Sequence, residues 1–297
     1  MNVDAQARAA GAYLLPPPGD ARRLSRWAYR RRCVAEAAAV LAQRRPSQAS
    51  LIHYERRWTR HAALARWRDA PDVDRAVRLS SYGDRILGAL IDFEPYAIRA
   101  PSFFGWRAEL LAAILGRHAP LDEGIVEVGC GLGKNLVALA RHGFSALAGF
   151  DGVPAAVEAV REQAMRFALP IEAGIWDLRD PPPPAAAALA HGATVLTNYV
   201  LEQFPTELDR AVDAIASLHP RQVLCIEPST LRPAGHTLRL ELAVSALHAR
   251  RRGYHTDIVG GLRALERRGR LTIREVVPLG FSPHLTHSPA LVRWSPA

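Results

Sequence analysis

Two kinds of hydrophobic pattern alternate along the chain after residue 100. Short apolar runs, among them 125–128, 146–150 and 193–197, are bounded by glycine, proline or polar residues. Between them lie longer segments in which apolar residues recur every three or four positions. The short runs predict strands, and the longer segments predict helices. Strands and helices that alternate in this way indicate an α/β fold with a doubly wound, mostly parallel sheet.

The pattern predicts seven strands and seven helices in this region. The strands are expected at 125–128, 146–150, 171–175, 193–197, 221–226, 271–278 and 290–294. The helices are expected at 103–116, 134–141, 153–168, 185–190, 206–218, 236–251 and 257–268. The last two strands are joined by a segment rich in proline and histidine and predict a hairpin-like finish. We therefore expect a seven-stranded sheet whose last strand is antiparallel.

The N-terminal third of the chain has a different pattern. Residues 1–20 end in three prolines and predict a flexible arm. Helical spacing predicts an all-helical extension over 21–102, with helices at 21–44, 48–68 and 73–91. The sheet domain is then expected at 103–297. The segment 92–106 is dense in aromatic residues and contains two prolines, which predicts a loop able to close over a ligand.

Composition indicates a globular protein with reduced thiols. Nearly half of the residues, 49%, are hydrophobic, and the three cysteines have no paired spacing. The N-terminus lacks the basic start and apolar stretch of a signal peptide. No apolar run approaches the roughly 20 residues that span a bilayer. We therefore expect a cytoplasmic protein without a membrane partner.

The positive charge of the chain is concentrated near its N-terminus. Residues 1–120 hold 20 arginines against 11 acidic residues, whereas 121–297 hold 18 basic and 18 acidic residues. The predicted helices over 21–68 are therefore a candidate platform for nucleic acid. Lys134 is the only lysine among the 38 basic residues, and so lopsided a ratio is also typical of a GC-rich genome. The same helices could instead pair two subunits in a homodimer or roof a substrate site.

A glycine-rich turn lies between the first predicted strand and the helix that follows it. The strand 125–128 leads into Gly129, Gly131 and Gly133, and the helix begins near Lys134. A strand, a tight turn and a helix N-terminus form a cradle for a nucleotide-like ligand. Dinucleotide oxidoreductases use the spacing GxGxxG, which would require a third glycine where this chain has Lys134.

Acidic or polar residues follow the other predicted strands. Asp151, Asp177, Asn198 and Glu227 end successive apolar runs. In an open α/β sheet the ligand lies over the carboxyl ends of the strands, where the strand order reverses. A carboxylate one strand after the glycine turn suits two ribose hydroxyls. Asp177, one strand further, is placed to accept from an exocyclic amine.

This set of residues resembles the class I S-adenosylmethionine-dependent methyltransferases over about 103–297. The segment Glu127-Val-Gly-Cys-Gly-Leu-Gly133 matches that family's acid-x-Gly-x-Gly-x-Gly turn. Asp151 matches its ribose-binding acid and Asp177 its adenine-binding acid. The resemblance implies a Rossmann-like fold, S-adenosyl-L-methionine as cofactor and S-adenosyl-L-homocysteine as product. The cofactor-binding residues that it implies are Glu127, Gly129, Cys130, Gly131, Gly133, Asp151, Gly152, Trp176, Asp177 and Asn198.

Methyl transfer requires a positioned acceptor and, for a hydroxyl or a protonated amine, a base. The candidate catalytic residues are His255, His236 and Glu202. His255 lies in the unusual cluster Gly253-Tyr-His-Thr-Asp257, where a helix-capping role is the alternative. The spacing of histidines and acids matches no metal motif, so we predict no metal site. The candidate substrate residues are Tyr96, Arg99, Phe103, Trp106, Tyr199 and Tyr254, with Arg99 as a partner for a carboxylate.

The sequence leaves three functions open. The favoured hypothesis is methyl transfer to an oxygen or nitrogen of a small molecule, of sugar or secondary-metabolite type. The second is an RNA methyltransferase that binds nucleic acid through the basic N-terminal helices, although no RNA-binding module is visible there. The third is a non-catalytic protein that keeps the cofactor fold and uses the N-terminal region to dock a partner.

Overall fold

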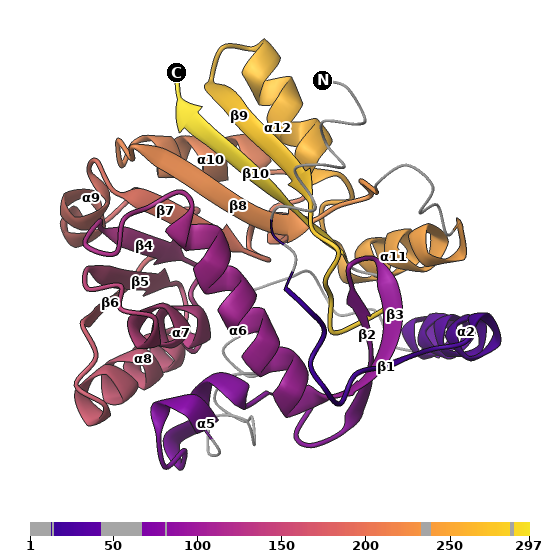
Figure 1. The fold of residues 1–297 in the computed structure, drawn as a ribbon. Coiled ribbons are helices and arrows are strands. Elements are labelled where there is room, and N and C mark those ends of the chain that lie inside the picture. The colour runs from indigo at the N-terminus through magenta and orange to yellow at the C-terminus, as the bar shows by residue number, and fades with distance from the viewer. Residues whose placement is uncertain (1–12, 14, 43–66, 81, 233–238, 286–287) are drawn as a thin grey trace.

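The computed structural model describes residues 13, 15–42, 67–80, 82–232, 239–285 and 288–297, and every structural statement below concerns these ranges. They form a seven-stranded central sheet with helices on both faces and a smaller three-stranded sheet (Figure 1). The small sheet lies beside helices α2 (Arg26–Ala42) and α11 (Arg239–Arg252), which pack against each other.

The central sheet has the strand order β6-β5-β4-β7-β8-β10-β9. Its strands are β4 (Ile125–Val128), β5 (Leu147–Asp151), β6 (Ile171–Ile175), β7 (Thr194–Asn198), β8 (Gln222–Pro228), β9 (Leu271–Pro278) and β10 (Pro289–Pro296). The pairs among the first five strands are parallel, whereas β10 runs antiparallel to both of its neighbours. This confirms the predicted seven-stranded, mostly parallel sheet with an antiparallel last strand. The strand order reverses between β4 and β7, which puts the expected ligand site above that point.

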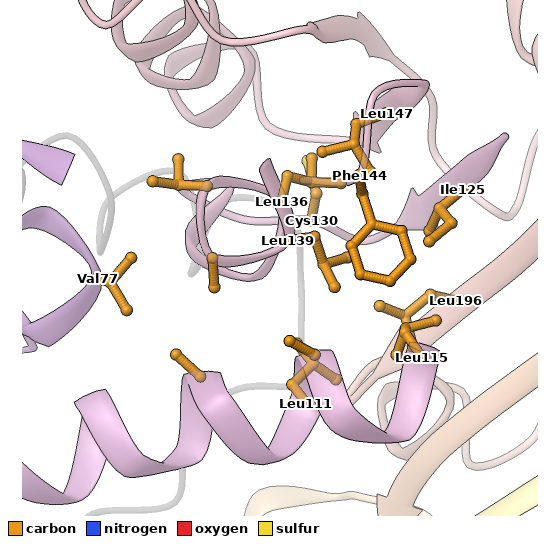
Figure 2. Packing of buried hydrophobic residues seen from close by; sticks show 14 of the residues in the cluster. Val77, Leu111, Leu115, Ile125, Cys130, Leu136, Leu139, Phe144, Leu147 and Leu196 are labelled. Carbon is orange, nitrogen blue, oxygen red and sulfur yellow. The ribbon is translucent and has the colours of Figure 1, made fainter. Parts of the chain in front are cut away.

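Two hydrophobic cores cover the two faces of this sheet because successive side chains of a strand point to opposite faces. Ile125 packs with helices α6 (Ala100–Gly116), α7 (Lys134–Arg141) and α8 (Pro154–Arg166). Its neighbour Val126 packs in the second core, with α9 (Pro184–Ala190), α10 (Leu208–Ala216) and α12 (Ile258–Arg267). Figure 2 shows part of the first core, where Leu111 and Leu115 of α6 face the side chains of α7 and the sheet.

The N-terminal region is not all-helical, so that prediction is wrong over 86–99. Helix α5 (Val73–Arg78) ends eight residues before strand β2 (Ile86–Ile91), which pairs with β3 (Glu94–Arg99) in an antiparallel hairpin. A short strand β1 (Arg22–Arg23) adds to the other edge of β3. The predicted helix at 48–68 lies almost wholly outside the described residues.

The hairpin turn explains why the sequence pattern misled. Asp92 and Phe93 both adopt positive φ angles, 52° and 59°, as the two central residues of a type I′ turn do. Such turns usually contain Asn-Gly or Asp-Gly, and this chain has Asp-Phe instead. The predicted loop at 92–106 is therefore the turn, strand β3 and the first turns of α6. A freely moving lid over these residues is incompatible with their pairing in a sheet.

The small sheet is joined to the connection between β9 and β10. The backbone of Leu90 exchanges two hydrogen bonds with Ser282, at 2.9 and 3.1 Å, and Phe93 donates to the carbonyl of Gly280 at 3.0 Å. A Cβ at Gly280 would lie 2.4 Å from the Phe93 nitrogen, so only glycine allows this approach. The contact brings β2 and its hairpin turn next to the 280–285 segment.

Two further expectations can be compared with the described ranges. Cys33, Cys130 and Cys225 are buried, unpaired thiols, as predicted. Among the helices described, none is both long and apolar enough to cross a lipid bilayer.

Candidate functional site

The glycine turn between β4 and α7 has the geometry that its sequence predicted. Gly129, Gly131 and Gly133 all have positive φ angles, of 70°, 53° and 69°. A Cβ at Gly129 would lie 2.5 Å from Val200 Cγ2, and one at Gly133 would lie 2.7 Å from Val160 Cγ2. Both positions therefore require glycine for backbone conformation and for space. The turn brings backbone N–H groups to the N-terminus of α7, which favours a ligand carrying lone pairs or negative charge.

Glu127 is a buried carboxylate directly before this turn. It is 1% exposed, and its Oε1 accepts a 2.5 Å hydrogen bond from Asn135 Nδ2. Its Oε2 is buried and has no hydrogen-bond partner among the described residues. Burial raises the pKa of Glu127 to about 8, against the opposing effects of Asn135 and Arg107. A buried, unsatisfied carboxylate oxygen costs free energy unless a ligand donor reaches it.

Arg107, on α6, is a candidate site residue that the sequence pattern did not bring out. Its Nη1 donates to Asn135 Oδ1 at 3.3 Å, and its guanidinium lies 6.0 Å from the centroid of the Phe281 ring. Burial lowers the pKa of Arg107, and the charge of Glu127 acts in the opposite direction. Within the described structure no carboxylate forms an ion pair with it. A signal was available in the sequence, because Arg107 lies on the same helix face as the buried Phe103 and Leu111, four residues to either side.

Arg99, which the sequence analysis chose as the carboxylate partner, lies elsewhere. It is exposed at the end of β3, directly before α6. Arg107 follows Arg99 by eight positions, which is about two turns of helix. The guanidinium near the glycine turn therefore belongs to the second arginine.

Asp151 ends β5 and is fixed beside the glycine turn. Its Oδ2 accepts from Gly131 N at 2.8 Å, and its Oδ1 accepts from Val153 N at 2.9 Å. Burial raises the pKa of Asp151, while these two N–H groups oppose the change. Each oxygen still has a second lone pair, so the carboxylate can also accept two ligand hydroxyls. Gly152 and Cys130 lie next to these residues in the chain, and the Cys130 side chain is buried.

The residues after β6 differ in what they offer a ligand. Asp177 is clamped by Arg179, whose Nη2 and Nε donate to its carboxylate at 2.7 and 3.0 Å. Burial would raise the pKa of Asp177, but Arg179 outweighs it and the pKa lies below its ordinary value. Trp176 is 4% exposed and packs edge-on against Phe150 in the core. Its ring therefore supports the site from within the core rather than presenting a face to a ligand.

The end of β7 is held by a buried glutamate from β8. Glu227 Oε1 accepts from the Thr197 hydroxyl at 2.9 Å and from the backbone N–H groups of Val200 and Leu201 at 3.1 and 3.2 Å. Burial raises the pKa of Glu227 to about 7, although these donors oppose the shift. Tyr199, inside this loop, has a positive φ of 60°. The network fixes the loop that begins at Asn198, whose buried Oδ1 has no hydrogen-bond partner in the described structure.

The candidate bases are brought near this loop only in part. Glu202 lies in the 3₁₀ helix η1 (Leu201–Gln203) and is buried, and its carbonyl accepts from His255 N at 2.6 Å. His255 Nδ1 accepts from Asp257 N at 3.1 Å, and Asp257 in turn caps α12. This is the helix-capping arrangement that the sequence left as the alternative. Tyr254 lies beside the His248 ring, and His236 is outside the described residues.

Three of the predicted substrate residues belong to other parts of the fold. Phe103 is fully buried in the core beneath the small sheet. Trp106 donates its indole N–H to the carbonyl of Pro16 at 3.0 Å. Tyr96 is half-buried within β3, opposite Arg23 and Ala89. Of the predicted set, only Tyr199 lies in the loop that the Glu227 network fixes.

A cavity of about 500 Å³ lies at the opposite edge of the sheet, lined by Gly124, Ser145, Leu169 and Leu189 among others. These residues begin or precede the strands β4, β5 and β6, or end α9. The chemistry-bearing side chains stand at the carboxyl ends of the same strands. We therefore do not assign the ligand site to this cavity.

Comparison with known proteins finds matches to the fold but not to the sequence. No protein-family model and no curated protein sequence matches the chain. Solved structures do match it. Magnesium protoporphyrin IX methyltransferase (ChlM) from Synechocystis PCC 6803 with bound SAM is 16% identical, with a TM-score of 0.51 over 85% of this chain and 100% of that one. The pyocyanin biosynthetic protein PhzM is 14% identical, with a TM-score of 0.50 over 66% of this chain and 57% of that one.

The chain has the class I methyltransferase fold. The strand order, the antiparallel last strand and the glycine turn after the first strand of the sheet all belong to that fold. In the methyltransferase fold, Glu127, Asp151 and Asn198 converge where the strand order reverses. Arg107 reaches the same place from a helix in front of the sheet.

Proposed function

We propose that this protein transfers a methyl group from S-adenosyl-L-methionine to an oxygen or nitrogen of a small molecule. The observation that carries the proposal is the complementary charge around Asn135. One side of this amide is bonded to the Glu127 carboxylate, and the other accepts from the Arg107 guanidinium. The α-amino acid end of the donor carries an ammonium and a carboxylate. The ammonium needs an acidic partner and the carboxylate needs a basic one, and Glu127 and Arg107 provide the two.

The residues present fit that group. Glu127 Oε2 and Asn198 Oδ1 are buried acceptors without partners in the described structure, and both suit an ammonium donor. Arg107 uses one of its five N–H donors, which leaves a planar fork for a carboxylate. A buried cation without an anion is costly, so a ligand carboxylate at this point would be bound with a charge-assisted gain.

The nucleoside end of the donor would meet the next two strands. Asp151 is oriented by two backbone N–H groups and keeps one lone pair on each oxygen for the ribose hydroxyls. Asp177 is held ionised by Arg179 and can accept from an exocyclic amine through its remaining lone pairs. We assign Gly129 and Gly131 to the positions where the backbone comes closest to the bound donor.

The bound donor would supply a methyl group that is activated for in-line displacement by its positive sulfur. The protein then has to hold the acceptor in line and exclude water. Tyr199, fixed by the Glu227 network, is a candidate wall of the acceptor site because it directly follows Asn198. A small-molecule acceptor agrees with the names of the two fold neighbours, one acting on magnesium protoporphyrin IX and one serving pyocyanin biosynthesis.

Titration calorimetry with S-adenosyl-L-homocysteine tests the donor assignment. The wild-type protein should bind this product, and Asp151→Asn should weaken binding by about tenfold or more through loss of the charged acceptor. Asp122→Asn removes an exposed carboxylate at the opposite edge of the sheet and serves as the matched control. A wild-type protein that does not bind the product, or equal binding by the Asp151 variant, would contradict the proposal.

A further inference from the structure

Tyr82 and His284 form a hydrogen-bonded pair that the donor site does not use. Tyr82 lies in the turn before β2, and His284 lies in the connection between β9 and β10. Tyr82 Oη and His284 Nε2 are 2.7 Å apart, and the two rings meet edge to face with centroids 5.7 Å apart. The backbone bonds between Leu90 and Ser282 hold the two segments together. Residues 202 positions apart in the chain are thus fixed within proton-transfer distance.

The pair lies on the same side of the sheet as the donor residues. The Tyr82 ring stacks on Phe104, at a centroid distance of 5.9 Å and an interplanar angle of 18°. The Phe104 ring in turn lies 5.5 Å from the ammonium of Lys134, the residue that follows the glycine turn. Tyr82 also contributes, after burial, to the raised pKa of Tyr199, as do Glu202 and Glu227, whereas Arg107 lowers it. Tyr82 therefore lies near both the start of α7 and the loop after β7.

A second Tyr–His pair in the same protein shows what a structural pair looks like. Tyr13 Oη and His118 Nε2 are 2.8 Å apart, near the amino ends of the strands. Glu275 accepts from the Tyr13 hydroxyl at 3.3 Å and lies 3.7 Å from His118. Burial lowers the pKa of His118, the charge of Glu275 opposes this shift, and the carboxylate ties the pair to β9. Burial is the one cause that shifts the pKa of His284, and it favours the neutral ring that can accept a proton.

We propose that Tyr82 and His284 take the proton of the methyl acceptor, and that the acceptor group is a phenolic or enolic hydroxyl. This inference rests on the proposed methyl transfer. The acceptor oxygen bonds the methyl carbon while the carbon–sulfur bond breaks and its electron pair stays on sulfur. The acceptor proton passes to Tyr82 Oη as the Tyr82 hydrogen passes to His284 Nε2. The imidazolium then releases its proton to water, so atoms and charge balance.

The acidity of the acceptor follows from the base. A buried neutral imidazole is a weak base, and proton transfer is efficient when donor and acceptor have similar pKa values. Phenols and enols are much more acidic than the hydroxyls of sugars. A sugar or a secondary metabolite was open as the substrate, and a weak base held by Tyr82 favours an aromatic secondary metabolite over a sugar.

The test uses full-length protein, methyl-labelled S-adenosyl-L-methionine and four defined probes. Catechol, 4-nitrophenol and 2-naphthol supply phenolic hydroxyls, and methyl glucoside supplies alcohols. The wild type should label at least one phenol and leave the glucoside unlabelled. Transfer to the glucoside alone, or to none of the probes by a protein that binds S-adenosyl-L-homocysteine, overturns the phenolic class. Failure to bind that product overturns the proposed function instead.

Variants of both pairs identify the base. Tyr82→Phe and His284→Gln should lower kcat on the labelled phenol by about 100-fold or more, with unchanged affinity for S-adenosyl-L-homocysteine. Tyr13→Phe and His118→Gln remove the same hydrogen bond at the opposite edge of the sheet and should leave kcat near that of the wild type. If the Tyr82 and His284 variants have the same kcat as the wild type, the proposal is overturned.

The pH profile of the wild type gives a second measurement, which does not depend on how the variants fold. Activity should fall as the pH drops through the lowered pKa of His284, because the imidazolium cannot accept a proton. Tyr82 interacts electrostatically with Tyr199, on which Arg107, Glu202 and Glu227 also act, whereas the pKa of His284 is shifted by burial. A wild-type kcat that does not fall at low pH would contradict the assignment of His284 as the base.

Discussion

Asn135 Nδ2 lies 2.5 Å from Glu127 Oε1, and the Oδ1 of the same amide accepts from Arg107. One neutral side chain thus separates the buried carboxyl group of Glu127 from the partly buried guanidinium of Arg107, and the two form no direct ion pair in the described structure. The arrangement leaves a carboxyl group that a ligand ammonium can ionise and a cation that a ligand carboxylate can pair with, as a zwitterion requires.

We expect Arg107 to recognise the carboxylate of the donor. Arg107→Met should lower the affinity for S-adenosyl-L-homocysteine by about tenfold to a hundredfold, which is the range for the loss of a hydrogen bond to a charged group. Methylthioadenosine lacks the amino-acid end, so its affinity should not change. The Met variant should be at least as stable as the wild type in thermal unfolding without ligand, because it removes a buried cation. Calorimetry with both ligands measures the difference.

Arg99→Met is the matched control, since Arg99 lies exposed at the start of the same helix. It should leave both affinities unchanged. If Arg99→Met lowered the affinity for S-adenosyl-L-homocysteine and Arg107→Met did not, the carboxylate partner would be Arg99, as the sequence suggested. Arg107→Lys keeps the charge without the planar fork and should give an intermediate affinity.

Donor binding should release a proton from Glu127. Burial raises the pKa of Glu127 to about 8, so near pH 7 the free protein holds this carboxyl mainly protonated. An ammonium group at Oε2 favours the ionised form and lowers the pKa. The affinity for S-adenosyl-L-homocysteine should therefore rise between pH 6 and about 8. At pH 7 the apparent binding enthalpy should depend on the ionisation enthalpy of the buffer.

Glu127→Gln should abolish that buffer dependence. The same residue has a signature in folding, because its unfolded pKa is near 4.5 and its folded pKa is higher. Between these values the folded state binds more protons, so the free energy of unfolding falls as the pH rises. The Gln variant should flatten this slope in denaturant melts across pH 5 to 8. An unchanged slope would show that Glu127 ionises normally in the folded protein.

The central sheet could be predicted because its signals are local. Apolar runs of four to seven residues ended in acids, and glycines marked the turn, so strand ends and ligand edge followed from the pattern alone. Asp151 and Glu127 lie at the same edge of the sheet, as this reasoning predicted, because the carboxyl ends of parallel strands meet there; their binding of a cofactor stays a prediction.

The proposed acceptor side could not be predicted because its contacts are non-local. Tyr82 and His284 meet only through a hairpin whose Asp92-Phe93 turn carries no glycine. Phe103 and Trp106 were chosen for their chemistry, but helix periodicity buries Phe103 and directs Trp106 to Pro16. The spacing of Arg107 from Phe103 and Leu111 indicated a shared helix face, but not that Arg107 would contact Asn135 beside the glycine turn.

Gly129 should tolerate no side chain. Gly129→Ala combines a positive φ of 70° with a Cβ 2.5 Å from Val200 Cγ2. The backbone conformation costs about 1–2 kcal/mol and the overlap about 1–3 kcal/mol more. Gly192 has a similar positive φ of 71°, but a Cβ added there would have nothing within 4 Å. Gly192→Ala therefore measures the cost of the backbone conformation alone. Urea melts of both variants measure the difference.

Adding Val200→Ala to Gly129→Ala should recover much of the second cost, because it removes the methyl groups that the new Cβ meets. If Gly129→Ala and Gly192→Ala were equally destabilising, the turn would be able to move away from the β7 loop. Donor affinity of the double variant then shows whether the turn has kept its geometry.

The buried ion pair between Arg232 and Glu241 should be among the most sensitive points of the fold. Its side chains are each 4% exposed and 2.9 Å apart, and Tyr29 of α2 donates to the same carboxylate at 3.2 Å. Arg232→Met leaves Glu241 buried without its cation and should cost about 3–5 kcal/mol. Arg268→Met breaks a pair that is more than half exposed, with Asp209, and should cost about 0–1 kcal/mol. Denaturant melts of the two variants decide this, and equal losses would mean that water reaches the Glu241 carboxylate when its partner is removed.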